Sequence, residues 1–176
     1  MPQDKLPYSD IKKRVDAIIG EGAQTVLTQM NAPKGTSSPK TTPRGLSITS
    51  PFGMRNGGPH KGADVRATTG QTLLYNATGK VIQTHSGCQV GDLNCGGGWG
   101  NHVRIRNSDG SIITFAHLSR VDVNNNQTVN ATTTIGLTGN TGHSYGAHLH
   151  VEYIAPGSSV QIDPAPYLDK YISLLH

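Results

Sequence analysis

Residues 146–152 of this 176-residue chain read Gly-Ala-His-Leu-His-Val-Glu. The alternation of polar and apolar residues predicts a β-strand, in which every second side chain lies on the same face. His148 and His150 therefore share one face, while Leu149 and Val151 pack on the opposite one. Two imidazoles on one face can reach a single small site. Short His-x-His pairs also occur by chance, so this segment alone does not establish a metal site.

Two further segments place side chains that can bind metals next to glycines. They read Gly-Pro-His-Lys-Gly-Ala-Asp at 58–64 and Thr-Phe-Ala-His-Leu-Ser at 114–119. His60 and Asp64 lie in a turn-rich stretch that has no clear helix or strand pattern. Imidazole and carboxylate both bind Zn²⁺, and three protein ligands plus a water form a catalytic zinc site. His60, Asp64 and one of the two histidines of residues 146–152 would supply those ligands.

His117 ends a predicted strand in which Ile113 and Phe115 share its face. We expect its ring to project over the rim of a cleft. The three segments together contain two histidines more than the metal requires. Imidazoles next to a zinc-bound water are suited to general acid–base catalysis.

Outside residues 1–45 the sequence indicates a mostly β, largely antiparallel domain. The 22 glycines and 10 prolines favour turns between short strands over a helical bundle. Asn-Ser-Asp-Gly at 107–110 predicts the turn of a hairpin. Segments rich in β-branched or aromatic residues predict strands at residues 72–77, 80–85, 102–107, 112–117 and 148–154.

Residues 1–45 are expected to form an appendage to a domain that spans residues 46–176. Apolar spacing predicts an amphipathic helix at 9–30, which can dock on a partner, and a linker rich in proline, serine and threonine follows at 31–45. No stretch approaches the ~20 apolar residues of a membrane span. The N-terminus lacks a hydrophobic signal region, so export would require a signal that has been removed or another route.

The formal net charge of +4 suggests a weak attraction to anionic polymers such as the bacterial wall. The basic residues are scattered and form no run with stacking aromatics, so nucleic acid is not an expected partner. Cys88 and Cys95 flank a glycine-rich segment, which predicts a disulfide and an oxidising compartment. Free thiols and a second metal site are the alternatives for this pair.

These segments together resemble the lysostaphin-type, or LytM-like, zinc endopeptidases of peptidoglycan. The resemblance covers residues 47–168. Its motifs occur in the family's order: Ser-Pro-Phe-Gly-Met-Arg at 50–55, His-x₃-Asp at 60–64, Gly-Asn-His-Val at 100–103, Phe-Ala-His-Leu-Ser at 115–119, Gly-Asn-Thr-Gly at 139–142, His-Leu-His-Val-Glu at 148–152 and Asp-Pro-x-Pro-Tyr-Leu at 163–168.

The resemblance implies an antiparallel β-sheet domain with one Zn²⁺ in a groove across the sheet. It assigns metal binding to His60, Asp64 and His150, and catalysis to His117 and His148. The implied substrate is peptidoglycan, and the implied location is extracytoplasmic: periplasmic, secreted or virion-associated. The resemblance does not assign which catalytic histidine is the base, nor which peptide bond is cleaved.

The chain departs from the family pattern in three places. Phe115 stands where tyrosine is frequent, and Ala147 stands where proline is frequent. Residues 86–99, which contain both cysteines, form a longer insertion than the simplest members carry, and we expect a loop near one end of the groove. Among the remaining histidines, we expect His143 at the rim of the groove. Structural roles are expected for the other three, His85, His102 and His176.

Three other functions compete with a peptidoglycan peptidase. A non-catalytic binding module with this fold would usually lack one or more ligands, whereas all five positions are intact here. A zinc peptidase that acts on a protein would share the same site. A purely architectural zinc site usually has four protein ligands, often cysteines, which is not the pattern of this chain.

Overall fold

The computed structural model describes residues 41–55 and 57–176. The helix predicted at 9–30 lies outside the described residues, as does the linker up to residue 40. Within the described ranges, no helix has the length and apolar character needed to cross a membrane. The domain boundary at residue 45 therefore stays a prediction.

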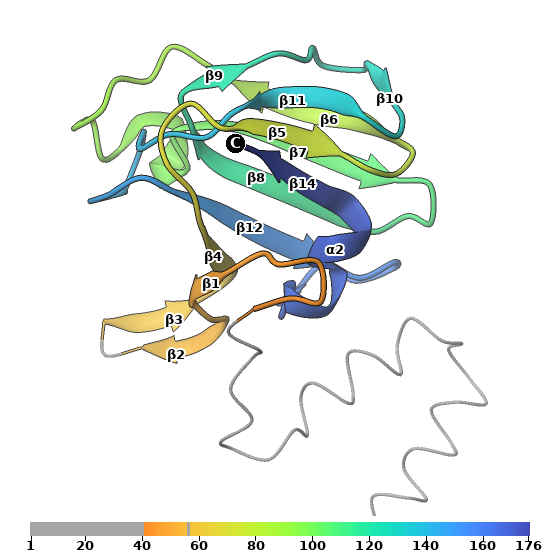
Figure 1. Ribbon diagram of the computed structural model, residues 1–176, viewed down its shortest axis with the longest axis horizontal. Helices are drawn as coiled ribbons and strands as arrows, with labels where there is room; N and C mark the ends of the chain where they lie inside the picture. The colour runs from red at the N-terminus through yellow and green to blue at the C-terminus, as the bar shows by residue number, and fades with distance from the viewer. Residues whose placement is uncertain (1–40, 56) are drawn as a thin grey trace, which may run out of the picture.

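The larger sheet has eight antiparallel strands, and the strand of residues 148–154 lies inside it, paired on both sides (Figure 1). Seven strands lie side by side across it, and the eighth pairs with the C-terminal end of the strand of residues 148–154. In order they are β1 (Ile48–Ser50), β4 (Ala63–Arg66), β12 (His148–Ile154), β8 (Ile112–Leu118), β7 (Asn101–Asn107), β6 (Gly79–His85) and β10 (Thr128–Val129), with β13 (Gln161–Ile162) beside β12.

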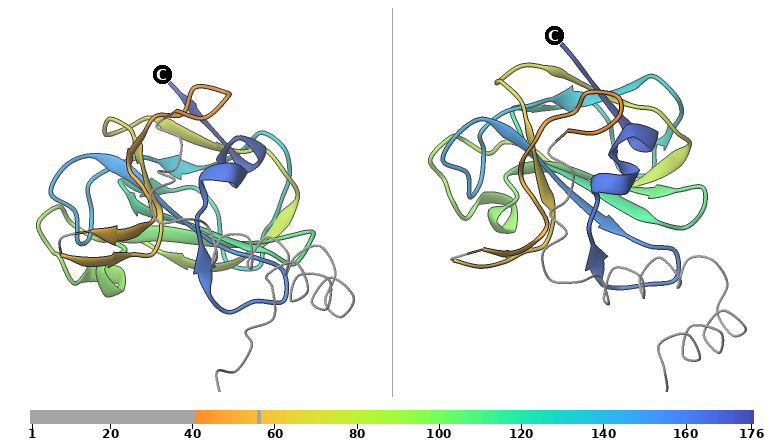
Figure 2. Two further views of the ribbon diagram at one scale, coloured as in Figure 1. Left: turned by 90° about the horizontal axis from the view of Figure 1, so that it is seen from below. Right: turned by 60° about the horizontal axis from the view of Figure 1, so that its bottom comes forward.

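A second, four-stranded sheet covers one face of the first, as the two views of Figure 2 show together with Figure 1. The hairpin of β2 and β3 stands apart from both sheets. The second sheet has the order β14 (Ile172–Leu175), β5 (Thr72–Tyr75), β11 (Thr133–Leu137), β9 (Arg120–Val121); the remaining elements are β2 (Gly53–Arg55), β3 (Gly58–His60), η1 (Cys95–Gly98), η2 (Ala165–Tyr167) and α2 (Leu168–Tyr171).

The five predicted strands all form, and the fold is mostly β and antiparallel as expected. The predicted turn at 107–110 joins β7 to β8, where Gly110 has a φ of 89° and its N–H donates to the Asn107 carbonyl. Our interpretation of residues 58–64 was wrong, because His60 ends β3 and Asp64 lies in β4. These strands are only three and four residues long, too short to produce a recognisable alternation.

The apolar core lies between the two sheets. Leu149 and Val151 of β12, with Ile113 and Phe115 of β8, are fully buried against residues of the second sheet such as Leu73. Each such side chain contributes about 1.5–3 kcal/mol of burial free energy. Because this packing fixes which face of β12 is apolar, it also fixes the face that carries His148 and His150.

Candidate metal centre and active site

Three predicted metal ligands meet on the face of the larger sheet that is turned away from the core. His150 of β12 and Asp64 of β4 are directly paired across the strands, with Nδ1 of His150 2.8 Å from Oδ1 of Asp64. Nε2 of His60 lies 3.2 Å from each of these two atoms. Ligand atoms around a common tetrahedral zinc are separated by about 3.3 Å. The three side chains therefore fit one zinc ion with little movement.

Both histidine rings are held with a lone pair toward this centre. Nδ1 of His60 donates to the carbonyl of Pro51 at 2.8 Å, which leaves Nε2 as the acceptor in the neutral ring. Nε2 of His150 donates to Oε1 of Glu152 at 3.1 Å, which leaves Nδ1 facing Asp64. Outer hydrogen bonds of this kind orient imidazole ligands and fix their tautomers.

Glu152 is a site residue that our sequence reasoning did not single out. It is buried and shares the face of His148 and His150, because it follows His150 by two positions in β12. That spacing was visible in the sequence, and a carboxylate two positions after the second histidine was the available signal. Its second oxygen accepts a hydrogen bond from Gln161 at 3.1 Å.

His117 and His148 stand beside the three predicted ligands. Their ring centroids are 4.9 Å apart, and the centroid of His117 is 5.7 Å from that of His150. Nδ1 of His117 donates to the carbonyl of Thr141 at 2.7 Å, and Nδ1 of His148 donates to that of Gly146 at 2.8 Å. Each neutral ring therefore keeps an Nε2 lone pair that is free to accept a proton.

The prediction that His117 shares the face of Ile113 and Phe115 was wrong. Those two residues are fully buried in the core. The ring of His117 instead lies next to His148 and lines the groove on the opposite face of the sheet. His117 has a φ of 60°, in the left-handed region, at a shift in register between β7 and β8. This irregularity breaks the alternation and turns the His117 ring toward the metal ligands instead of the core.

The charges of the cluster favour a cation. Burial opposes ionisation of Asp64, but polar contacts with three histidine rings, His148 foremost, hold its pKa well below its usual range. Burial also disfavours the charged form of His150, yet hydrogen bonds to Asp64 and Glu152 raise its pKa to about 9. In the metal-free protein, protons on the histidines thus neutralise the two carboxylates, and a divalent ion can replace them.

The pKa values of the two remaining histidines are shifted in opposite directions. Burial, together with the charge of the neighbouring His148, lowers the pKa of His117 to about 4. Burial also acts against protonated His148, but its hydrogen bond to Asp64 raises the pKa of His148 above the ordinary value. Adjacent groups whose pKa values are pushed apart are suited to the separate roles of base and acid.

All five histidine and aspartate side chains open onto one groove of about 840 Å³. One wall is the insertion, through Leu93, Asn94 and residues 97–99. Arg55 of the β2–β3 hairpin also lines the groove, as does the loop of residues 143–145, where the His143 N–H donates to the Gly98 carbonyl of the insertion at 2.7 Å. The insertion therefore borders the groove as predicted, and His143 lies at its lining as expected.

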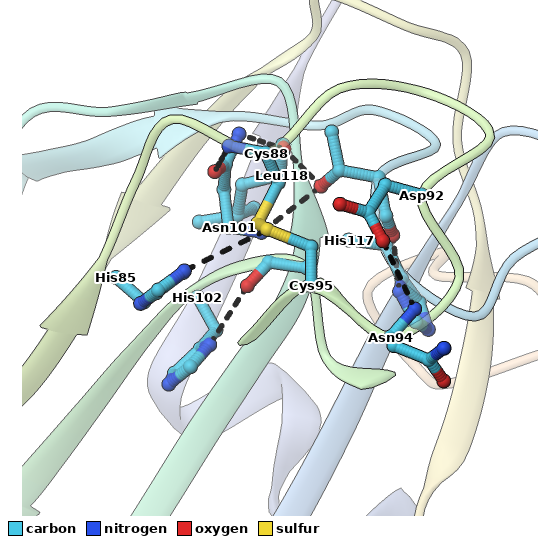
Figure 3. Close-up of a disulfide and its surroundings, with 11 residues drawn as sticks. His85, Cys88, Asp92, Asn94, Cys95, Asn101, His102, His117 and Leu118 are labelled. Atoms are coloured by element: carbon cyan, nitrogen blue, oxygen red, sulfur yellow. Dashed lines mark hydrogen bonds between the residues drawn. A yellow bond between two sulfur atoms is a disulfide. The ribbon is translucent and has the colours of Figure 1, made fainter. Parts of the chain in front are cut away.

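Cys88 and Cys95 form a disulfide, as predicted (Figure 3). The bonded sulfurs exclude the alternatives of free thiols and a second metal site in this state, although Nε2 of His85 lies 3.7 Å from Sγ of Cys95. His102 is buried, and its Nδ1 donates to the carbonyl of Gly100 at 2.9 Å. His176 contacts the side-chain amide of Gln71, outside the groove.

Known proteins with similar sequences include enzymes and an activator of enzymes. The peptidoglycan DD-endopeptidase ShyA of Vibrio cholerae is 32% identical over 102 residues, which are 58% of this chain and 22% of ShyA. The murein hydrolase activator NlpD of Escherichia coli is 31% identical over 138 residues, which are 77% of this chain and 33% of NlpD. The chain thus spans a fifth to a third of the length of these relatives.

The structure resembles the catalytic domain of the antimicrobial peptidase lysostaphin from Staphylococcus simulans. The TM-score is 0.54 at 28% sequence identity, over 69% of this chain and 89% of that domain. The model of peptidase family M23 matches residues 58–164, more than half of the chain. That range contains the three predicted metal ligands together with His117 and His148. The chain belongs to peptidase family M23.

Proposed function

We propose that this chain is a zinc-dependent endopeptidase that hydrolyses peptide bonds in the cross-links or stem peptides of bacterial peptidoglycan. The observation that carries the proposal is the convergence of His60, Asp64 and His150 next to two further imidazoles in one open groove. A zinc ion held by those three side chains would lower the pKa of a bound water and polarise the carbonyl of the scissile bond.

The two other histidines perform the proton transfers of the hydrolysis. His117 is neutral near pH 7, since burial lowers its pKa to about 4, and it accepts the proton of the attacking water at Nε2. The contact with Asp64 raises the pKa of His148, so its Nε2 carries a proton. His148 donates this proton to the leaving amine. The carbonyls of Thr141 and Gly146 hold the Nδ1 atoms and so keep both rings oriented.

The wall polymer as substrate is supported by the relatives and by the shape of the site. ShyA is named as a peptidoglycan endopeptidase, and the lysostaphin domain as an antimicrobial peptidase. The open groove suits a polymer better than a small molecule. The disulfide supports an extracytoplasmic location, since such bonds persist in oxidising compartments. A docking partner for the helix predicted at 9–30 stays a prediction.

Digestion of purified peptidoglycan tests the proposal. The zinc-loaded chain should release new free amines from sacculi of at least one of two wall chemotypes, and mass analysis of the products should identify the bond cleaved. A chelator should abolish the release, and added zinc should restore it. Proteins offered as substrates should yield no new amines. Stoichiometric zinc without amine release from either wall would contradict the proposal.

A second candidate function is activation of other hydrolases, which the similarity to NlpD over 77% of the chain favours. An activator needs its binding surface but not its proton-transfer groups. His117→Asn should therefore abolish digestion by the chain alone if the chain is the enzyme. If the chain is an activator, the same variant should still stimulate a separate hydrolase as strongly as the unmodified chain does.

A further inference from the structure

The insertion of residues 86–99 does more than border the groove. We propose that Trp99 is a positioning residue that holds the metal ligand His150 through Glu152 and fixes the backbone at His117, and that the Cys88–Cys95 disulfide keeps Trp99 in place. The inference rests on the metal site of the proposed function and adds a control element to it.

Trp99 reaches the site through two separate hydrogen bonds. Its indole Nε1–H donates to Oε1 of Glu152 at 3.1 Å, the same oxygen that accepts from Nε2 of His150 at 3.1 Å. Its backbone carbonyl accepts the N–H of His117 at 2.8 Å. One residue of the insertion thus contacts the carboxylate partner of His150 and the backbone of the proposed base, His117.

The contact with His117 acts where the backbone is unusual. His117 has a φ of 60°, a conformation that non-glycine residues adopt only when the surroundings impose it. The hydrogen bond from the His117 N–H to the Trp99 carbonyl helps to hold this conformation. A second hydrogen bond joins the His117 ring to the Thr141 carbonyl. The hydroxyl of Thr141 in turn donates to the Leu118 carbonyl at 2.7 Å.

The Trp99 ring is fixed by packing on the larger sheet. It meets the buried ring of His102 edge-on, with centroids 5.1 Å apart and planes at 70°. The guanidinium of Arg104 lies 5.5 Å from the centre of the Trp99 ring. These contacts define the direction of the indole N–H, so the bond to Glu152 does not depend on a freely rotating side chain.

The backbone before Trp99 is intrinsically free to move. Gly96, Gly97 and Gly98 all have positive φ values, of 62°, 69° and 95°. Three consecutive glycines have many accessible conformations, so this segment needs an external constraint to hold one of them.

The disulfide supplies that constraint at the first residue of η1. Cys95 begins η1, and its carbonyl accepts the N–H of Gly100 at 3.0 Å. At the other end of the bridge, the Cys88 N–H donates to Asn101, whose side-chain amide donates to the carbonyl of Leu118 at 3.0 Å. Figure 3 shows the bridge beside Asn101 and Leu118, next to the end of β8 that carries His117. The bridge therefore ties the glycine segment to the catalytic end of the sheet.

Zinc affinity measured by competition with a chromogenic chelator tests the inference without requiring catalysis. Trp99→Phe keeps a large ring over His102 but removes the N–H that holds Glu152. The zinc dissociation constant should rise about tenfold, as it does when outer partners of metal ligands are removed. Asn76→Ala, which removes a partly buried hydrogen bond to Ser173 in the second sheet, is the matched control and should leave it unchanged.

A double-mutant cycle separates positioning from general structural support. If Trp99 acts through Glu152, then Trp99→Phe should weaken zinc binding much less in a Glu152→Gln background than in the unmodified chain. A merely structural role for Trp99 would lower the thermal midpoint of the metal-free protein and leave the zinc dissociation constant unchanged. That result in a folded Trp99→Phe variant would overturn the inference.

The disulfide is tested independently, which also covers the case in which Trp99→Phe does not fold. The Cys88→Ser/Cys95→Ser double variant should bind zinc more weakly than the unmodified chain and turn over more slowly. Unchanged zinc affinity in this variant would refute the role of the bridge. If the unmodified chain binds no zinc, the proposed function itself fails; if it binds zinc and the variants bind equally well, only the present inference fails.

Discussion

His150 and Asp64 face each other across β12 and β4, with Nδ1 of the histidine 2.8 Å from Oδ1 of the aspartate. The two residues are 86 positions apart in the chain, and the register of one strand pair brings them together. A register slip of one residue would move one of them to the core face. The same packing of Leu149 and Val151 that stabilises the sheet thus determines which side chains meet at the candidate metal site.

Removal of a ligand should abolish metal binding without unfolding the domain. Asp64→Asn keeps the size of the side chain but replaces the charged ligand that contacts all three neighbouring histidines. His60→Ala removes a second ligand. Both variants should lose stoichiometric zinc in elemental analysis and lose hydrolysis. Asp122→Asn, at an exposed pair with Arg120, serves as the control, and zinc retained by Asp64→Asn would argue against the ligand assignment.

Substitution of His117 should separate turnover from metal binding. Asparagine is the suitable replacement, because it tolerates the left-handed φ of 60° at this position. His117→Asn should keep one zinc per chain and lower kcat by about 10²–10⁴-fold, the usual contribution of a general base. Elemental analysis and steady-state hydrolysis of muropeptides measure the two quantities. A variant with near-normal kcat would exclude His117 as the base.

Zinc affinity should rise with pH up to about 9. The pKa of His150 in the metal-free protein is raised to about 9 by Asp64 and Glu152, which outweigh the opposing effect of burial. Zinc must displace this proton, so each pH unit below 9 should weaken binding about tenfold. Chelator competition at pH 7, 8 and 9 measures the slope. A flat profile over this range would show that His150 is not protonated in the metal-free state.

His117 should destabilise the metal-free protein in mild acid. Burial lowers its folded-state pKa to about 4, below the unfolded value near 6.5. Between these values the unfolded chain binds the proton more strongly, so stability falls as pH falls from 6.5 to 4. The loss is at most about 3 kcal/mol. His150 and His148 have raised folded-state pKa values and add stability as the pH falls toward 6.5, where the unfolded chain titrates, so the effect of His117 is measured against a variant that lacks it.

Denaturant unfolding of the metal-free protein at pH 7 and pH 5 checks this sign. Relative to His117→Asn, the unmodified chain should lose stability between pH 7 and pH 5. Carboxylate titration, which affects Asp64 and Glu152 at lower pH, lies outside the interval. Equal pH dependence in both proteins would contradict the assignment.

Gly62 should be intolerant of a side chain. A Cβ at this position would meet the carbonyl of Val151 and lie 2.7 Å from Cε1 of His150. Gly62→Ala should therefore displace the His150 ring, cost about 1–3 kcal/mol of stability and weaken zinc binding. Gly57→Ala is the matched control, because nothing lies within 4 Å of its Cβ. Equal zinc affinity in the two variants would show that the ring is not held against Gly62.

The sequence predicted the long strands well because their alternation is extended enough to recognise. It missed β3 and β4, whose three or four residues leave no pattern, and therefore described His60 and Asp64 as belonging to turns. It also misjudged the face of His117, because period-two alternation does not anticipate a residue with positive φ at a register shift. Glu152 was visible by its spacing from His150, yet its role depends on contacts from Trp99 and Gln161.

The sequence by itself determined the chemistry of this protein: the residue types that can bind zinc, the shared face of His148 and His150, the cysteine pair and the predominance of β structure. These follow from local periodicity and composition, which each short segment carries within itself. Only the tertiary structure decided which distant atoms meet, that the backbone at His117 turns its ring toward the ligands, and that Trp99 reaches Glu152. Those relationships depend on strand register and packing between segments far apart in the chain, and no local pattern contains them.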